Sequence, residues 1–171
     1  MDIILGLDMS SQKSGYALFI DGKLSDYGLW VLSHEEETDW RNRIAYMADC
    51  VAQYCVDNNV QRIYVEDVPP IIENSQTIKI LSALQGMLIA CATLHDIQID
   101  FIPVKAWEKK LSVDYVNHTF GLDLIYKSPT SKFNQDDIAD SINIAWSQIG
   151  DVQEYDLETF EDIMNRFYDL L

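Results

Sequence analysis

The chain has few cysteines, few prolines and few basic residues, and each shortage excludes a class of protein. It contains three cysteines, four prolines and seven glycines among 171 residues. So little proline and glycine excludes collagen-like and low-complexity chains. The odd number of cysteines, and their lack of metal-ligand spacing, argue against a disulfide scaffold and a thiolate metal site. We therefore expect Cys50, Cys55 and Cys91 to be small buried residues of a cytoplasmic protein.

Long apolar runs and a secretion signal are also missing. No apolar run reaches about 18 residues, the length that indicates a membrane helix, so we expect no membrane partner. The opening residues "MDIILGLD" lack a basic region before their apolar run, and we expect no signal peptide. With 48% hydrophobic and 23% charged residues, the composition is typical of a globular protein. The length then favours a single domain over residues 1–171.

Positive charge is scarce: 12 Lys and Arg residues face 28 Asp and Glu residues, for a formal net charge of −16. Taken alone, this argues against a nucleic-acid partner, because phosphate binding depends on Lys and Arg. However, many acids lie in residues 34–39 and from 151 onward. They form either an ordinary solvated surface or a negatively charged region that restricts non-specific DNA binding. Residues 105–132 instead have more basic than acidic residues. Their lysines are Lys105, Lys109, Lys110, Lys127 and Lys132.

Hydrophobic patterning and turn residues predict an α/β protein. Three apolar runs before residue 32, with a hairpin turn at Asp21-Gly22 and a turn residue at Gly15, predict an antiparallel meander of three strands. Helices and strands alternate after it, which predicts a mixed five-stranded sheet with helices on both faces. We expect helices over residues 39–58, 75–95, 104–111, 114–121, 134–146 and 156–171, and strands over 61–67 and 97–103. Gly86 is expected to allow close packing of its helix.

Carboxylates end two of the predicted strands and lie near the start of the helix over residues 134–146. Asp8 ends the first strand and Glu66 the fourth, and sites in such sheets lie at the carboxyl ends of strands. Asp137 and Asp140 are three residues apart and hence share a helix face. Clusters of oxygen ligands suit Mg²⁺ or Mn²⁺, and two such ions about 3.5–4 Å apart clamp the attacking and leaving oxygens of a phosphodiester.

Each of these acids also has an ordinary explanation. Asp136 and Asp137 lie in a predicted first helical turn, where an acid gains about 0.3–1 kcal/mol from the helix dipole. Acids that follow strands, such as Asp8, are often turn residues. The polar residues after it either line a site or form a turn. They are Ser10, Ser11, Gln12 and Lys13.

The motifs, taken in order, resemble those of a known family. "ILGLDMSSQKSGYALF" resembles the first strand–turn–strand of the RuvC-type Holliday junction resolvases, which belong to the RNase H-like superfamily. "IYVEDV" resembles the family's strand that ends in a catalytic glutamate, and "DDIADSINIAW" resembles its closing "DxxDA" helix, with Asp136 before the motif as a helix-start residue. The resemblance spans roughly residues 2–146 and implies an RNase H-like nuclease domain. The implied catalytic and metal-binding residues are Asp8, Glu66, Asp137 and Asp140.

The resemblance also implies an activity. Proteins of this family are endonucleases that cut phosphodiesters in branched DNA and resolve Holliday junctions by paired nicks. For this chain it implies one or two Mg²⁺ ions, with Mn²⁺ as a substitute, and branched DNA as the partner. Two symmetric cuts imply a homodimer, and the apolar helix over residues 75–95 is the candidate dimer surface. The implied DNA contacts are Lys105 and a second cation at Lys109, Lys110 or Lys132.

The chain departs from the family at two places. "VPPII" follows the glutamate where an aromatic residue is usual, and Met9-Ser10 follow the first aspartate in place of the usual glycine. Pro69 and Pro70 can wedge between bases but provide no aromatic surface for stacking. We therefore expect a relaxed specificity that includes forks and flaps, as in a bacteriophage version acting in the host cytoplasm. The acidic tail over residues 151–171 lies outside the resemblance, and a packing helix is expected there. A nuclease for RNA–DNA hybrids and a non-catalytic acidic adaptor stay open as alternatives.

Overall fold

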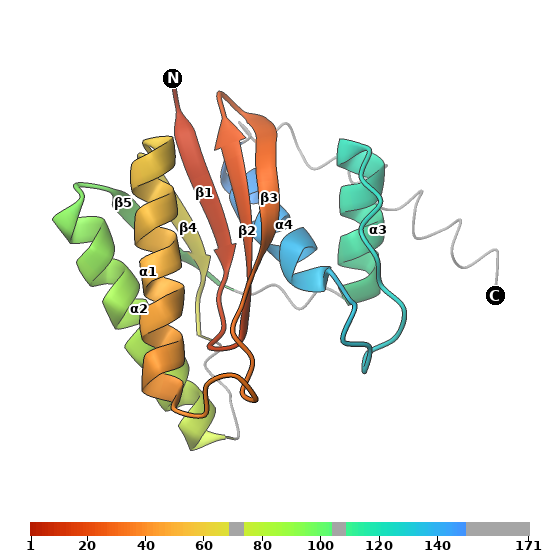
Figure 1. The fold of residues 1–171 in the computed structure, drawn as a ribbon. Helices are drawn as coiled ribbons and strands as arrows, with labels where there is room; N and C mark the ends of the chain where they lie inside the picture. The colour runs from red at the N-terminus through yellow and green to blue at the C-terminus, as the bar shows by residue number, and fades with distance from the viewer. Residues whose placement is uncertain (69–73, 104–108, 150–171) are drawn as a thin grey trace.

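A mixed sheet with helices on both sides forms the body of the protein. The computed structural model describes residues 1–68, 74–103 and 109–149. Over these residues the sheet has the five strands predicted, and their order is β3-β2-β1-β4-β5 (Figure 1). The strands are β1 (Ile3–Asp8), β2 (Lys13–Ile20), β3 (Lys23–Val31), β4 (Arg62–Glu66) and β5 (Gln98–Ile102). The helices are α1 (Trp40–Asn58), α2 (Ser75–Leu94), α3 (Lys109–Phe120) and α4 (Asp136–Ile149).

Hydrogen-bond pairing puts β1 at the centre of the sheet. It pairs antiparallel with β2, and β2 pairs antiparallel with β3, which confirms the predicted meander. The β2–β3 turn has left-handed backbone at Asp21 (φ 48°) and Gly22 (φ 75°), the conformation that this pair of residues favours. On its other side β1 pairs parallel with β4, and β4 pairs parallel with β5. The carboxyl ends of β1 and β4 and the start of β2 therefore lie at one edge of the sheet.

Two apolar layers cover the sheet. Leu5 and Leu7 of β1 are buried in a core shared with α1 and α2. Ile4, whose side chain is on the opposite face of the strand, is buried in a second core shared with α3 and α4. Figure 1 shows the two helix pairs on opposite sides of the strands. Because both faces are covered, β1 is an almost continuous apolar run rather than an alternating one.

Two glycines bring α4 directly onto the sheet. A Cβ atom at Gly6 would lie 2.2 Å from the carbonyl oxygen of Ser141, and one at Gly15 would lie 1.9 Å from that of Asp137. Real Cβ atoms do not approach backbone this closely, so α4 packs here because both residues lack a side chain. Gly15 was expected to turn the chain. It instead lies within β2, opposite Asp8, and sets the position of the first turn of α4.

The helix starts follow their capping residues. The side chain of Asp39 accepts a hydrogen bond from the backbone of α1, and that of Asn74 accepts from the backbone of α2. The expected close packing at Gly86 is wrong within the chain, because a Cβ atom there would meet nothing within 4 Å.

Two predictions fall partly or wholly outside the described residues. α3 is a single helix from residue 109 to 120, where two short helices were expected, and residues 104–108 are not described. The predicted packing helix over residues 156–171 also lies outside the described part of the chain. One domain over residues 1–171 stays a prediction.

Candidate active site

The four predicted carboxylates gather at the carboxyl edge of β1 and β4. Asp8 is the last residue of β1 and Glu66 the last of β4, while Asp137 and Asp140 lie in the first turns of α4. α4 begins directly over Gly15, which pairs with Asp8. The side chains of Asp8 and Glu66 are hydrogen-bonded, and Asp8 also experiences the charges of both α4 aspartates. The fold thus brings together all four residues that the sequence pattern singled out.

Burial and negative neighbours act together on Asp8. Desolvation by burial, the hydrogen bond with Glu66 and the charges of the other three carboxylates raise the pKa of Asp8 well above its ordinary value of 3.8. Four carboxylates share this site, and together they disfavour the ionised form of Asp8. The site therefore has an excess of negative charge, which a divalent cation relieves.

A lysine contributes one positive charge to the same edge. Lys13, the first residue of β2, forms an ion pair with Asp137, and the two side chains are 30% and 20% exposed. Its Nζ also donates a hydrogen bond of 2.7 Å to the carbonyl of Asn134, in the segment that leads into α4. The residues after Asp8 were expected either to line a site or to form a turn. Lys13 lines the site.

Serine hydroxyls shape the turn that presents this lysine. Ser10 Oγ accepts from the backbone N–H of Lys13 at 3.0 Å and donates to its carbonyl at 2.8 Å. Ser14, which is fully buried, donates through Oγ to the carbonyl of Ser10 at 2.9 Å. These bonds hold the β1–β2 connection where RuvC-type proteins usually have glycine after the aspartate. They also fix the backbone from which the Lys13 side chain extends.

A buried chain of hydrogen bonds holds Asp140. Ser112 of α3 is fully buried, and its Oγ donates to Asp140 Oδ1 at 2.7 Å. Asn143 Nδ2, about one turn along α4, donates in turn to Ser112 Oγ at 2.8 Å. No sequence pattern indicated Ser112, because it lies on another helix and reaches the site only through the packing of α3 against α4.

Ser112→Ala is expected to lower the free energy of unfolding by about 1–3 kcal/mol, because Asp140 and Asn143 each lose a buried partner. The measurement is thermal or urea unfolding. Ser141→Ala is the matched control, since Ser141 is equally buried but donates only to the Ile138 carbonyl of its own helix. If both variants lose the same free energy of unfolding, the hydrogen bond between Ser112 and Asp140 does not contribute more to stability than an ordinary buried serine contact.

The donor set fits a hard divalent cation such as Mg²⁺ or Mn²⁺. Such ions prefer carboxylate oxygens, and binding an ion favours the ionised form of the carboxylates that hold it. In their present conformations, no three His, Cys, Asp or Glu side chains in the described part of the chain are placed to bind a metal ion together. Two contacts account for this: Asp137 is turned to Lys13 and Asp140 is held by a serine. Asp8 and Glu66 are therefore the residues around which an ion site would assemble.

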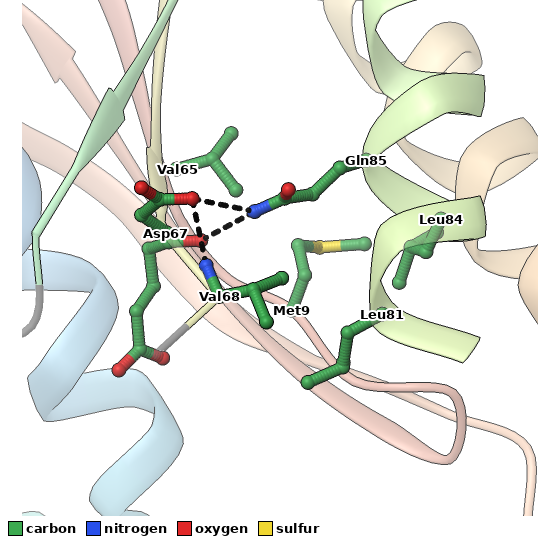
Figure 2. Close-up of a pocket in the computed structure, with 8 residues that line it drawn as sticks. Met9, Val65, Asp67, Val68, Leu81, Leu84 and Gln85 are labelled. Carbon is green, nitrogen blue, oxygen red and sulfur yellow. Dashed lines mark hydrogen bonds between the residues drawn. The ribbon is translucent and has the colours of Figure 1, made fainter. Parts of the chain in front are cut away.

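An apolar hollow adjoins Glu66 on the side of α2 (Figure 2). Met9 and Leu81 line it, and Gln85 reaches across it from α2. Gln85 Nε2 donates to the Glu66 carbonyl at 3.4 Å and to Asp67 Oδ1 at 3.3 Å. These long hydrogen bonds connect α2 to the end of the strand that carries Glu66.

The predicted DNA-contacting residues are only partly described. Those outside the described residues, whose roles stay predictions, are Lys105, Pro69 and Pro70. Lys109 and Lys110 begin α3, and Lys132 is exposed in the loop before α4. Both segments are neighbours of α4, since α3 packs against it and the loop leads into it.

The loop before α4 is basic, internally hydrogen-bonded and exposes an aromatic residue. Residues 124–135 include two lysines and no acid. Asn134 is buried and holds the loop together: it accepts from the backbone N–H of Lys127 at 3.0 Å and donates to the carbonyl of Ser128 at 2.6 Å. Phe133 is 74% exposed, and Lys127 Nζ lies 5.3 Å from the centre of its ring. An aromatic ring and a cation thus stand together at the surface beside the start of α4.

The fold and the position of the acids define a class. A mixed sheet in the order β3-β2-β1-β4-β5, with acids at the ends of β1 and β4 and on the helix over β1, is the RNase H-like fold predicted above. No protein-family model matches the chain, and no curated protein matches it in sequence.

Solved structures of three resolvases are similar to this one. RuvC of Thermus thermophilus in complex with a Holliday junction substrate has a TM-score of 0.65 at 15% identity, covering 86% of this chain and 92% of that one. Fowlpox virus resolvase with Holliday junction DNA has a TM-score of 0.52 at 17% identity, covering 89% and 99%. The yeast mitochondrial Holliday junction resolvase Ydc2 has a TM-score of 0.52 at 13% identity, covering 97% and 84%. At such identities the similarity confirms the fold.

Proposed function

We propose that this protein is a metal-dependent endonuclease that cuts phosphodiesters in branched DNA and resolves four-way junctions by paired nicks. The observation that carries the proposal is the cluster of Asp8, Glu66, Asp137 and Asp140 on an RNase H-like sheet. Two of the similar structures were solved with Holliday junction DNA, which supports branched DNA as the substrate. We also propose a relaxed specificity that extends to forks and flaps, because the segment after Glu66 lacks the aromatic residue usual there.

The chain's own groups hold and orient the reacting parts. One or two Mg²⁺ ions, with Mn²⁺ as a substitute, would supply an activated water and neutralise charge on the leaving oxygen. Asp8 and Glu66 would hold an ion from the ends of adjacent strands, and Asp140 and Asp137 would supply further carboxylates from α4. Because two strands and a packed helix carry these groups, their positions vary little, as metal chemistry requires. No nucleophilic side chain is needed.

Cleavage of defined DNA substrates tests this function. The protein is incubated with a labelled four-way junction, a fork, a flap, a linear duplex and an RNA–DNA hybrid, each with Mg²⁺ or with EDTA. We expect metal-dependent nicks near the branch point and no cutting of the linear duplex. Cutting of the hybrid alone would favour the RNA–DNA hybrid nuclease. Binding without cleavage in both Mg²⁺ and Mn²⁺ would favour the non-catalytic adaptor.

Lysines in the segment that precedes α4 are the proposed phosphate contacts. In a chain with a net charge of −16, the loop over residues 124–135 has only basic charged residues. The local charge of this loop determines its contacts with phosphates, whereas the acidic rest of the chain affects how DNA approaches from a distance. The proposed contacts are Lys105, Lys109, Lys110 and Lys132, with Pro69 and Pro70 at the branch.

Phe133→Ala is expected to weaken binding of a four-way junction by about 1–3 kcal/mol, the cost of losing one base–aromatic stacking contact. The ring is exposed on a hydrogen-bonded loop next to Lys127, so a splayed base can stack on it while its phosphate meets a cation. Fluorescence anisotropy in EDTA measures the affinity without cleavage. Phe133→Tyr should bind like the wild type, and so should Val56→Ala, which trims an exposed side chain of α1. Unchanged affinity in Phe133→Ala would contradict this role.

The exposed face of α2 is the proposed homodimer surface. Ile78, Ile89 and Leu94 are exposed apolar residues of this helix, whereas Leu84 and Leu88 are buried in the core. Among the described helices, α2 alone has the length and composition to cross a membrane. Its buried residues make it a structural part of the domain, so we assign its exposed face to a second copy of the chain.

Ile89→Glu is expected to convert a dimer into monomers, because a carboxylate at a closed apolar interface is costly to desolvate. Light scattering at micromolar concentration gives the mass, and the ratio of paired to single nicks reports on coupling between the two sites. Val56→Glu on α1 is the control, since Val56 is 50% exposed and Ile89 46%. A wild-type chain that is monomeric, or that binds lipid vesicles through α2, would contradict the dimer.

A cytoplasmic location is proposed, in the host cell if a bacteriophage encodes the chain. All three cysteines are free. Burial raises the pKa of Cys55 to about 12, and burial also raises the pKa of Cys50 and Cys91. Such thiols are poor nucleophiles, which suits a protein kept reduced without catalytic cysteines.

A further inference from the structure

We infer that Lys13 is a resident cation of the carboxylate cluster, whose ammonium group takes the place of a second divalent ion at Asp137. The inference rests on the proposed metal-dependent nuclease and specifies how that site is charged. It implies that each site takes one ion, held at Asp8 and Glu66 with Asp140 nearby. Asp137, predicted from the sequence as a metal ligand, then acts through Lys13.

The contacts of Lys13 place its charge inside the cluster. Its Nζ forms an ion pair with the carboxylate of Asp137 and donates to the Asn134 carbonyl at 2.7 Å. An ammonium group has three donors, and the contacts with described residues use two of them. Both partners are largely shielded, with the Lys13 side chain 30% and that of Asp137 20% exposed. Solvent and salt therefore screen this pair less than an ordinary surface pair.

The packing of α4 on β2 fixes the distance between the two partners. Lys13 lies two residues before Gly15, and the backbone carbonyl of Asp137 rests directly on Gly15. The hydroxyl of Ser10 holds the backbone of Lys13 through both its N–H and its carbonyl. Because both backbones are held, the fold keeps the Lys13 side chain within reach of Asp137.

A divalent ion at Asp137 would compete with this ammonium group. Both cations need the same carboxylate oxygens, and an ion beside Lys13 would also face a like charge. Asp8 and Glu66 are different, because the ion pairs of the described residues involve neither of them. An ion therefore gains most at Asp8 and Glu66. A fixed ammonium group on the other side can stabilise charge that develops on a phosphate, without reorganisation at the moment of reaction.

Titration of Mn²⁺ into the protein by isothermal calorimetry, without DNA, tests the inference. The wild type is expected to bind one ion per chain. Lys13→Met should bind a second ion, and Lys13→Arg, which keeps the charge, should bind one. Lys23→Met is the matched control, because Lys23 is an exposed lysine at the opposite end of the same hairpin and should leave the count at one. Two ions in the wild type, or one ion in Lys13→Met, would overturn the inference.

Asp137→Asn provides a second test that does not depend on how Lys13→Met folds. If Asp137 acts through Lys13, this variant keeps the Mn²⁺ affinity of the wild type within about threefold, whereas Asp8→Asn loses binding by at least about tenfold. Equal losses in the two variants would overturn the inference. A wild type that binds one ion but cuts none of the DNAs would overturn the proposed function instead. Cleavage by a protein with two ions bound would overturn only the role of Lys13.

Discussion

Asp8→Asn is expected to reduce cleavage of branched DNA by at least about a hundredfold to a thousandfold, and to make the folded protein more stable at neutral pH. The loss of activity follows from the central position of Asp8, which hydrogen-bonds to Glu66 and experiences the charges of both α4 aspartates. The gain in stability has the same origin. Asn keeps the shape of the side chain but cannot ionise, so the variant avoids the cost of keeping a carboxyl group, charged or protonated, beside three other carboxylates.

The stability effect of Asp8→Asn depends on pH in a definite direction. The pKa of Asp8 is raised in the folded state, first by burial and then by Glu66 and the neighbouring charges. Below the ordinary value of 3.8 the carboxyl is protonated in both the folded and the unfolded chain and contributes nothing. As the pH rises above that value the unfolded chain ionises first, so the wild type loses stability until the folded pKa is passed. The variant should lack this part of the loss.

Thermal unfolding in EDTA between pH 4 and pH 8, together with the junction assay, checks both effects. The Tm of Asp8→Asn should exceed that of the wild type at neutral pH, and the difference should close near the ordinary pKa. Added Mg²⁺ should raise the Tm of the wild type more than that of the variant, because only the wild type retains the full ion site. Asp49→Asn, at an exposed position of α1, removes an equal charge and should change neither property. A less stable Asp8→Asn at neutral pH would contradict the crowding of charge around Asp8.

Gly15→Ala is expected to destabilise the protein and to reduce cleavage at the same time. The new Cβ atom would lie 1.9 Å from the Asp137 carbonyl oxygen and 3.0 Å from the backbone nitrogen of Ile138, so α4 must move away from β2. Forcing atoms into a packed interior costs about 1–3 kcal/mol, or about 2–12 °C in Tm for a chain of this size. The displaced turn carries Asp137, and a shift of about 1 Å at a catalytic group can cost about a hundredfold in rate.

Thermal unfolding and the junction assay measure both consequences in one variant. Gly86→Ala is the matched control for the change from glycine to alanine. A Cβ atom at Gly86 meets nothing within 4 Å, and a helix interior favours alanine by about 1 kcal/mol, so its Tm should rise. If Gly15→Ala unfolds and cleaves like the wild type, α4 does not rest on β2 as closely as the structure indicates.

The residues that sequence reasoning placed correctly are those whose signals are local. Asp8 and Glu66 end apolar runs, and the spacing of Asp137 and Asp140 puts them on one helix face. The hairpin at Asp21-Gly22 follows from the left-handed backbone that these residues tolerate. In each case the relevant neighbours lie within a few positions along the chain.

The residues that it misread or missed depend on contacts between distant segments. Gly15 has the composition of a turn residue, yet its role is to let α4 approach β2. Ser112 supports Asp140 from another helix, at 2.7 Å. Phe133 reads as an ordinary apolar residue, and only the structure shows that it is exposed beside a lysine. No periodicity or spacing marks such residues, because the partner that gives each its role is far away in the sequence.

By itself, the sequence determined the order of helices and strands, the mixed sheet and the four carboxylates, because apolar periodicity, turn residues and strand-end acids are local properties. Only the tertiary structure decided how those carboxylates are charged. It put Asp8 against Glu66 in a buried hydrogen bond, and it paired Asp137 with Lys13 across the junction of β2 and α4. Burial and like charges determine ionisation, and both are set by segments that meet only when the chain has folded.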